Sequence, residues 1–229
     1  MNRLAAVSSR VAPIRKPDAV FFDFDGVIVD SVDIKTSAFE SFYAEYGDEI
    51  VGKVREFHLA HGGVSRFAKF EYYESNILGK PADEGRIREL SQRFGELVEA
   101  RVIAAPAIPG AIECLSGLHG SVPIFIVSGT WEPELRRILE ARGLASLFAG
   151  VYGSPRSKMD ILATIIQERG FDPAACVMVG DAMTDYEAAS SLGLNFVGIV
   201  ARGTPSPFPT GTLIRFDLVG LESLLLAHG

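Results

Sequence analysis

Cysteine is scarce in this sequence, and apolar runs of membrane-spanning length are missing from it. The two cysteines among 229 residues, Cys114 and Cys176, lie far apart between apolar neighbours, so we expect buried free thiols and no disulfide or zinc scaffold. The formal net charge of −7 argues against nucleic acid as a partner, because Lys and Arg supply most of the affinity for its phosphates. We therefore expect a cytoplasmic protein that has neither a membrane nor a nucleic acid as its partner.

The first 17 residues differ in composition from the rest of the chain. They contain four basic side chains and no acidic one, but they lack the apolar segment of a secretory signal, so we interpret residues 1–17 as a flexible tail. The whole chain is 48% hydrophobic and 22% charged, which is typical of globular proteins. Its length suits one core domain that carries a smaller insertion.

Short apolar segments alternate with helical patterns over most of the chain. The segments expected to be strands buried on both faces are 19–24, 123–128, 147–153, 176–181, 195–200 and 212–216. Helical patterns occur at 111–119, 132–143, 157–170, 185–193 and 218–228. This alternation predicts an α/β fold with a doubly wound, Rossmann-like parallel sheet.

One long segment does not alternate. Residues 32–106 show helical patterns over 32–46, 63–78 and 83–104, and no convincing strand. We interpret 32–106 as a helical cap domain inserted into an α/β core that consists of residues 18–31 and 107–229.

Polar side chains gather where the expected strands end. Ligands of open α/β sheets bind beyond the carboxyl ends of the strands, so these residues should converge there. They are Asp23, Asp25, Ser128, Gly129, Thr130, Lys158, Asp181 and Asp185. An ionised carboxylate is costly to bury without a partner, so the acidic members predict a bound cation or a reaction. For Asp23 and Asp25 alone, a capped tight turn would be an equally good explanation.

Four of these stretches resemble, in order, the motifs of the haloacid dehalogenase-like hydrolase superfamily. They are "DFDGVIVDS", "IVSGT", Lys158 and "GDAMTD", and the helical insertion resembles the helical cap of that family. The resemblance covers residues 20–200 and is to the branch of helical-cap phosphatases and β-phosphoglucomutases. It implies a Mg²⁺-dependent phosphatase of a small phosphorylated metabolite, either a sugar phosphate or a phospho-acid.

The resemblance also implies roles for the two aspartates of the first motif. Asp23 would attack phosphorus and form an aspartyl-phosphate, which is then hydrolysed. Asp25 would act as general acid and then as general base, for which its pKa should be raised by its neighbours. Mg²⁺ would be bound by Asp23, by the main-chain carbonyl of Asp25 and by Asp181, while Asp185 orients its waters.

The remaining motif residues would bind the phosphoryl group. Ser128 would donate a hydrogen bond to it, assisted by the backbone N–H groups of Gly129 and Thr130, and Lys158 would act as a point charge. Simpler interpretations are that the segment 128–130 caps a helix, and that Asp185 caps the helix that follows it.

The stretch "GGVSR" resembles the cap loop of sugar-phosphate members of the family. By that match Gly63 and Arg66 are candidate substrate ligands, with His58, His61 and Lys69 as possible helpers. The alternative is that Ser65 caps a helix and that Arg66 lies on its solvated face.

Two other functions stay open at this point. A phosphosugar mutase of the β-phosphoglucomutase type would use the same nucleophile, and a non-catalytic module could bind a phosphorylated ligand without turnover. The sequence is compatible with a monomer or a homodimer.

Overall fold

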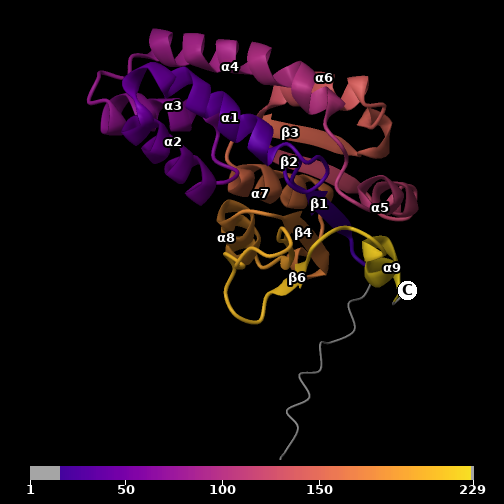
Figure 1. Cartoon of the computed structure of the whole chain (residues 1–229). Coiled ribbons are helices and arrows are strands. Elements are labelled where there is room, and N and C mark those ends of the chain that lie inside the picture. Colours follow the sequence, from indigo (N-terminus) through magenta and orange to yellow (C-terminus); the bar gives the residue numbers. More distant parts are fainter. Residues whose placement is uncertain (1–15, 228–229) are drawn as a thin grey trace, which may run out of the picture.

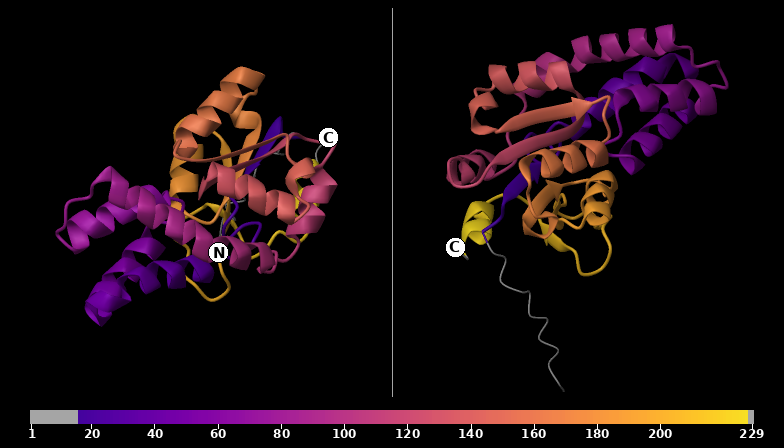
Figure 2. Two further views of the ribbon diagram at one scale, coloured as in Figure 1. Left: turned by 90° about the horizontal axis from the view of Figure 1, so that it is seen from above. Right: turned by 180° about the vertical axis from the view of Figure 1, so that it is seen from behind.

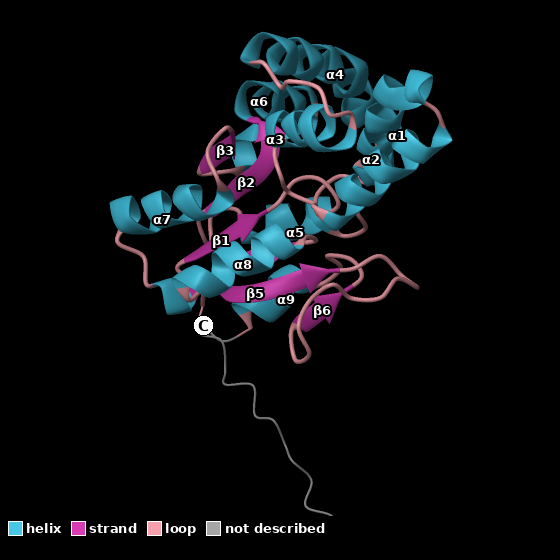
Figure 3. Ribbon diagram, turned by 90° about the vertical axis from the view of Figure 1, so that its left-hand side faces the viewer, coloured by secondary structure: helices cyan, strands magenta, loops and turns pink. Residues whose placement is uncertain are grey.

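A six-stranded parallel sheet forms the centre of the protein. The computed structural model describes residues 16–227, so residues 1–15 of the expected tail lie outside the described residues. The strand order is β3-β2-β1-β4-β5-β6, and every neighbouring pair is parallel. The strands are β1 (Ala19–Phe22), β2 (Ile124–Trp131), β3 (Gly150–Ser154), β4 (Cys176–Gly180), β5 (Asn195–Ile199) and β6 (Leu213–Arg215). All six expected strand segments are therefore confirmed (Figure 3).

Helices cover both faces of this sheet (Figure 1). They are α5 (Ala111–Leu118), α6 (Glu132–Ala141), α7 (Lys158–Arg169), α8 (Met183–Leu192) and α9 (Leu221–Leu226). Alternate strand residues bury into opposite layers: Phe21 packs in the layer of α7 and α8, whereas Val20 and Phe22 pack in the layer of α5, α6 and α9. Burial on both faces explains why β1, β2 and β4 are almost continuously apolar, whereas the edge strand β6 is exposed, contrary to expectation.

Residues 32–106, which lie between β1 and α5, contain helices and no strand, as expected. The helices are α1 (Val32–Tyr43), α2 (Asp48–Ala60), α3 (Arg66–Tyr72) and α4 (Glu84–Ala104), with a 3₁₀ turn at 44–46 and a π-helical turn at 73–77. Figure 2 shows these helices grouped on one side of the sheet. Their apolar interior, which includes Phe39, Phe70 and Phe94, is continuous with the layer of α5, α6 and α9. That residues 32–106 form a cap domain separate from the α/β core stays a prediction.

Two composition-based expectations can be compared with the structure. Cys114 and Cys176 are both free and buried, which confirms the prediction of core thiols. Within residues 16–227, no helix combines the length and the apolar character that crossing a membrane requires.

Candidate active site

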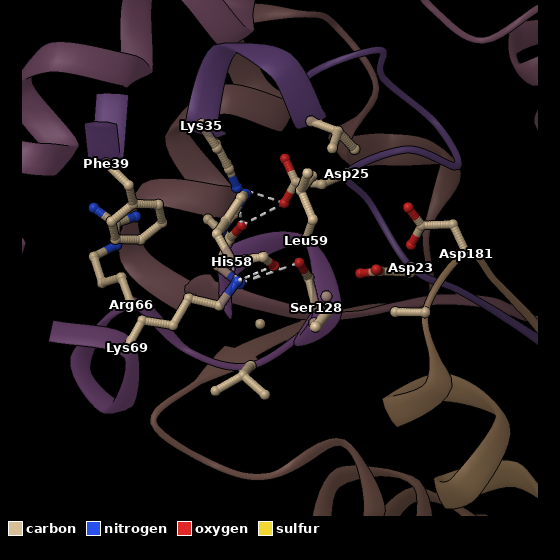
Figure 4. Close-up of a pocket in the computed structure, with 18 of the residues that line it drawn as sticks. Asp23, Asp25, Lys35, Phe39, His58, Leu59, Arg66, Lys69, Ser128 and Asp181 are labelled. Carbon is tan, nitrogen blue, oxygen red and sulfur yellow. Dashed lines mark hydrogen bonds and ion pairs between the residues drawn. The ribbon is translucent and has the colours of Figure 1, made fainter. Parts of the chain in front are cut away.

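The ends of three neighbouring strands bring the predicted residues together. Asp23 follows β1, Ser128 lies in the last part of β2, and Asp181 follows β4; β1 lies between β2 and β4 in the sheet. The strand order reverses at this point, which is where open α/β sheets bind ligands. A cavity of about 240 Å³ opens there, lined by all three of these residues and by side chains from α1–α3 (Figure 4).

Asp23 is buried and held by two donors. The exposed fraction of Asp23 is 3%; its Oδ1 accepts the N–H of Phe24 at 2.7 Å, and its Oδ2 lies 3.0 Å from Lys158 Nζ. Lys158 is also buried and donates to Asp185 Oδ1 at 2.5 Å. Burial opposes the charged form of Lys158, but the charges of Asp185 and Asp23 outweigh it and raise its pKa. Lys158 is therefore a fixed ammonium shared by two carboxylates.

Asp181 completes a cluster of three acidic groups. One carboxylate oxygen each from Asp23, Asp181 and Asp185 lies within 4.8 Å of the other two. Burial together with the neighbouring carboxylates raises the pKa of Asp181 well above its usual value, and burial raises that of Asp185 to about 7 although Lys158 opposes this. No basic side chain of residues 16–227 lies within 4.0 Å of the Asp181 carboxylate, so its charge has no counterion from the protein.

This cluster has the chemistry of a site for a hard divalent cation. All donors are carboxylate oxygens, which such ions prefer, and a bound cation would offset the mutual repulsion of the acidic groups. Gly26 supports this arrangement: a Cβ there would lie 2.2 Å from Asp181 Oδ2, and its φ of +75° favours glycine. The close approach of Asp181 to the loop after β1 thus requires glycine at position 26.

Asp25 points away from this cluster and into a separate set of hydrogen bonds. Its Oδ1 accepts from Ser31 Oγ at 2.6 Å, and its Oδ2 accepts from Lys35 Nζ at 2.5 Å and from Thr130 Oγ1 at 2.8 Å. Burial raises the pKa of Asp25, but the charge and hydrogen bond of Lys35, with the two hydroxyl groups, lower it overall. The expectation of a raised pKa is therefore wrong for this arrangement, because three donors stabilise the carboxylate.

The segment 128–130 presents its polar groups to the same cavity. Ser128 is 1% exposed and Thr130 is 4% exposed, and the Thr130 N–H donates to Ser128 Oγ at 3.2 Å. The helix that follows begins at Glu132, and its N-terminal boundary residue is Trp131, which makes no side-chain capping bond. Ser128 and Thr130 are therefore free of a capping role.

The loop before α3 lies directly on these residues. A Cβ at Gly63, whose φ is +73°, would lie 2.2 Å from Thr184 Oγ1 and 2.8 Å from Lys158 Nζ, and a Cβ at Gly129 would lie 2.2 Å from Gly63 O. Gly63 is thus brought to the site as expected, where its backbone closes over Lys158 and Gly129.

Arg66 is in the cavity wall but already has a partner. Its Nη2 lies 2.5 Å from Glu134 Oε1, its Nη1 donates to Ser91 O at 3.2 Å, and its guanidinium lies 5.0 Å from the centre of the Phe94 ring. The exposed fraction of its side chain is 6%. The alternative that placed Arg66 on a solvated face is wrong, although Ser65 does cap α3 by accepting the Ala68 N–H at 3.3 Å.

The other candidates from the helical segment separate into two groups. Lys69 and His58 are buried and line the cavity, and Lys69 Nζ lies 2.8 Å from His58 Nδ1. His61 is exposed, its ring stacks on Phe57, and it lies in a different surface hollow. The structure therefore does not bring His61 to the site.

Comparison with known proteins identifies the family. Residues 17–193 match the haloacid dehalogenase-like hydrolases. The chain belongs to this family. The phosphoglycolate phosphatase of Synechococcus elongatus is 27% identical over 190 residues, which are 79% of this chain and 82% of that protein. The match confirms both the family resemblance and the expected enzyme class, a hydrolase.

Solved structures of low sequence identity share the fold of this hydrolase. A putative β-phosphoglucomutase from Bacteroides vulgatus gives a TM-score of 0.73 at 17% identity, over 94% of this chain and 90% of its own. A mutant of CbbY from Rhodobacter sphaeroides, in complex with xylulose-(1,5)bisphosphate, gives 0.72 at 18% identity, over 90% of this chain and 96% of its own. These similarities confirm the α/β fold of the hydrolase.

Two residues of the hydrolase site were not predicted from the sequence. Lys35 contacts both Asp25 and Thr130, the latter at 2.7 Å, and Glu134 binds Arg66. Lys35 lies one helical turn after Ser31, which also binds Asp25, so the sequence did contain a local signal for it. Glu134 lies 68 residues from its partner, and no local pattern could have paired them.

Proposed function

We propose that this haloacid dehalogenase-like hydrolase is a Mg²⁺-dependent phosphatase that cleaves a small phosphorylated metabolite, a phospho-acid or a sugar phosphate. The observation that carries the proposal is the buried contact between Asp23 and Lys158, beside Ser128 and Asp181 at one cavity. A carboxylate nucleophile, a fixed positive charge and an acidic cluster that suits a cation are the groups that phosphoryl transfer to a side chain needs. The phosphoglycolate phosphatase of Synechococcus elongatus supports the phospho-acid.

In the first step Asp23 attacks phosphorus. A bond forms between its carboxylate oxygen and phosphorus while the bond from phosphorus to the leaving oxygen breaks, which gives an aspartyl-phosphate. The Phe24 N–H and Lys158 hold the carboxylate in one orientation. Lys158 and the Ser128 hydroxyl, with the N–H group of Gly129, stabilise the negative charge of the phosphoryl oxygens, while the Thr130 N–H holds Ser128 Oγ.

Asp25 moves the protons in both steps. As the leaving oxygen departs, Asp25 passes to it a proton from the Lys35 ammonium, which is hydrogen-bonded to Asp25, so Asp25 ends the step as a carboxylate and Lys35 as a neutral amine. In the second step water attacks phosphorus, Asp25 accepts a proton from this water and returns it to Lys35, and the bond between phosphorus and Asp23 breaks. The lowered pKa of Asp25 keeps it ionised and ready to accept a proton, and the contact with Lys35 supplies the proton that its role as an acid requires.

The acidic cluster suits Mg²⁺. Asp23 and Asp181 would hold the ion through their carboxylates and Asp25 through its main-chain carbonyl, with Asp185 close to it. When bound, the ion supplies positive charge opposite the phosphoryl oxygens. Asp185 in turn keeps Lys158 in place through their 2.5 Å contact.

The test compares the wild type with Asp23→Asn. Phosphate release is measured from 4-nitrophenyl phosphate and from 2-phosphoglycolate, with and without Mg²⁺. We expect wild-type turnover that requires Mg²⁺, and a loss of about a thousandfold or more in the variant, with an unchanged circular dichroism spectrum. Mass spectrometry of the quenched wild-type enzyme should detect one phosphoryl group on Asp23. Turnover by Asp23→Asn above a tenth of the wild-type rate would refute the assignment of the nucleophile.

The same preparation separates the two other functions. A mutase would convert β-glucose 1-phosphate into the 6-phosphate faster than it releases phosphate. A binding module would bind phosphorylated ligands without turning over any of them. The phosphatase proposal requires phosphate to be the main product from every substrate that is accepted.

A further inference from the structure

Three basic side chains line the cavity, and two of them already have a carboxylate partner. Lys35 is paired with Asp25, and Arg66 is paired with Glu134. Lys69 is different: within residues 16–227, no carboxylate lies within 4.0 Å of its amine. Among the described residues its Nζ hydrogen-bonds only to His58, at 2.8 Å from Nδ1 and 3.4 Å from the carbonyl oxygen.

Because Lys69 is buried, its ammonium group is costly in free energy without an oppositely charged partner. Its exposed fraction is 3%, and the ring of Phe39 lies 5.7 Å from its amine. Burial, together with the charge of Lys35, lowers the pKa of Lys69 to about 7. An ammonium removed from water needs compensation by an opposite charge. A ligand that brings a negative charge to this wall of the cavity would supply it.

His58 cannot supply that charge. An ammonium only donates, so His58 Nδ1 accepts and its ring is neutral, with its proton on Nε2. Burial and the nearby Lys69 lower the pKa of His58 to about 3, in agreement with a neutral ring. Below the pKa of Lys69, the pair thus carries one ammonium and one N–H donor, with a single net positive charge.

We propose, on the basis of the phosphatase function above, that Lys69 and His58 bind a carboxylate of the substrate while its phosphoryl group lies at Asp23. The substrate is then a short phosphomonoester that carries a carboxylate. One net positive charge suits a carboxylate better than a second phosphate, and a cavity of about 240 Å³ accommodates a small phosphomonoester. Figure 4 shows the Lys69 amine toward Ser128, whereas the Arg66 guanidinium lies at the Phe39 ring, farther from Ser128 and Asp23. Specificity is therefore assigned to Lys69 and not to Arg66, the residue singled out by the "GGVSR" motif.

The test measures binding, so that it does not depend on turnover. Calorimetry in the presence of Mg²⁺ gives the dissociation constants of 2-phosphoglycolate and 2-hydroxyethyl phosphate. The first ligand ends in a carboxylate, and the second ends in a neutral hydroxyl group instead. The measurements use the Asp23→Asn background, alone and combined with Lys69→Met or Lys69→Gln. Lys53→Met is the matched control, because Lys53 belongs to the same helical segment but is exposed and lies outside this cavity.

We expect the background protein to prefer 2-phosphoglycolate, and both Lys69 variants to lower the ratio of the two affinities by about 10- to 100-fold. Lys53→Met should leave the ratio unchanged. The proposal would be overturned if the background protein bound the two ligands with nearly equal affinity. It would also be overturned if neither Lys69 substitution changed the ratio of the two affinities. Loss of the ratio in Arg66→Lys but not in Lys69→Met would overturn it in favour of Arg66. Phosphate release by the wild type tests the phosphatase function separately, because the preference in binding is measured whether or not phosphate is released.

Discussion

Removing one partner of the buried ion pair between Arg66 and Glu134 should destabilise the protein strongly. The pair joins α3 of the helical segment to α6 beside the sheet, its N–O distance is 2.5 Å, and the two side chains are 6% and 1% exposed. Glu134→Gln removes the charge and keeps the shape, so it leaves the guanidinium buried without a counterion. Breaking such a pair costs about 3–5 kcal/mol, which is a large part of the roughly 5–15 kcal/mol that stabilises a typical domain.

Urea denaturation can measure this loss through Trp131. It is the only tryptophan, it precedes α6, and it is 38% exposed, so unfolding changes its surroundings. With an m-value of about 2–3 kcal/mol/M, a loss of about 4 kcal/mol lowers the midpoint by about 1–2 M urea. The control is Glu99→Gln, which breaks the exposed pair of Glu99 with Arg137 between α4 and α6. We expect that change to cost less than about 1 kcal/mol.

A double variant decides whether the charge pairing is responsible. Arg66→Met combined with Glu134→Gln removes both charges, so we expect it to regain at least about 2 kcal/mol relative to Glu134→Gln alone. Two results would contradict this reasoning. One is a cost of Glu134→Gln no larger than that of Glu99→Gln, and the other is additivity of the two single changes.

Three further predictions concern the cavity. Gly26→Ala should raise the Mg²⁺ concentration for half-maximal activity by about tenfold or more, because its Cβ would displace Asp181; an unchanged Mg²⁺ titration would contradict this. Lys35→Met should slow alkyl phosphates about 100-fold more than 4-nitrophenyl phosphate, because only poor leaving groups need the proton that Asp25 delivers; equal slowing across the series would exclude the role. The ratio of affinities for 2-phosphoglycolate and 2-hydroxyethyl phosphate should fall as the pH rises through about 7, because Lys69 is charged only below its pKa, and Lys69→Met should remove this dependence.

The inner strands were predictable because they are buried on both faces; β6 is the exception, since its Leu213 and Ile214 are exposed. A continuous apolar run is a local property of the sequence, and each expected strand lies within a few residues of the observed one. Helix α2 (Asp48–Ala60) was not predicted. Its Ile50, Val54 and Phe57 face the core and recur at helical spacing, so the sequence did contain a local signal for this helix.

The acidic part of the site was predictable for a different reason. Parallel strands end at one edge of a sheet, so polar residues after separate strands must meet there. That placed Asp23, Asp181 and Asp185 together before any distance was known, and the structure puts their oxygens within 4.8 Å. The state of Asp25 was not predictable, because its pKa depends on Thr130, which lies 105 residues away, as well as on nearby Lys35.

Charges of the cavity that lack a partner in the protein indicate what a ligand must bring. Six described residues that line the cavity are acidic or basic. Four of them contact an opposite charge: Asp23 and Asp25 contact lysines, and Lys35 and Arg66 contact carboxylates. The other two, Asp181 and Lys69, contact no opposite charge among the described residues. Asp181 and Lys69 do not form an ion pair with each other. A cation at Asp181 and an anion at Lys69 would compensate both charges, and a phosphomonoester that binds Mg²⁺ through its phosphate and carries a carboxylate brings one of each. The sequence shows which residues are charged but not which of them form ion pairs. Asp181 and Lys69 could therefore be recognised as unpaired only from the folded structure.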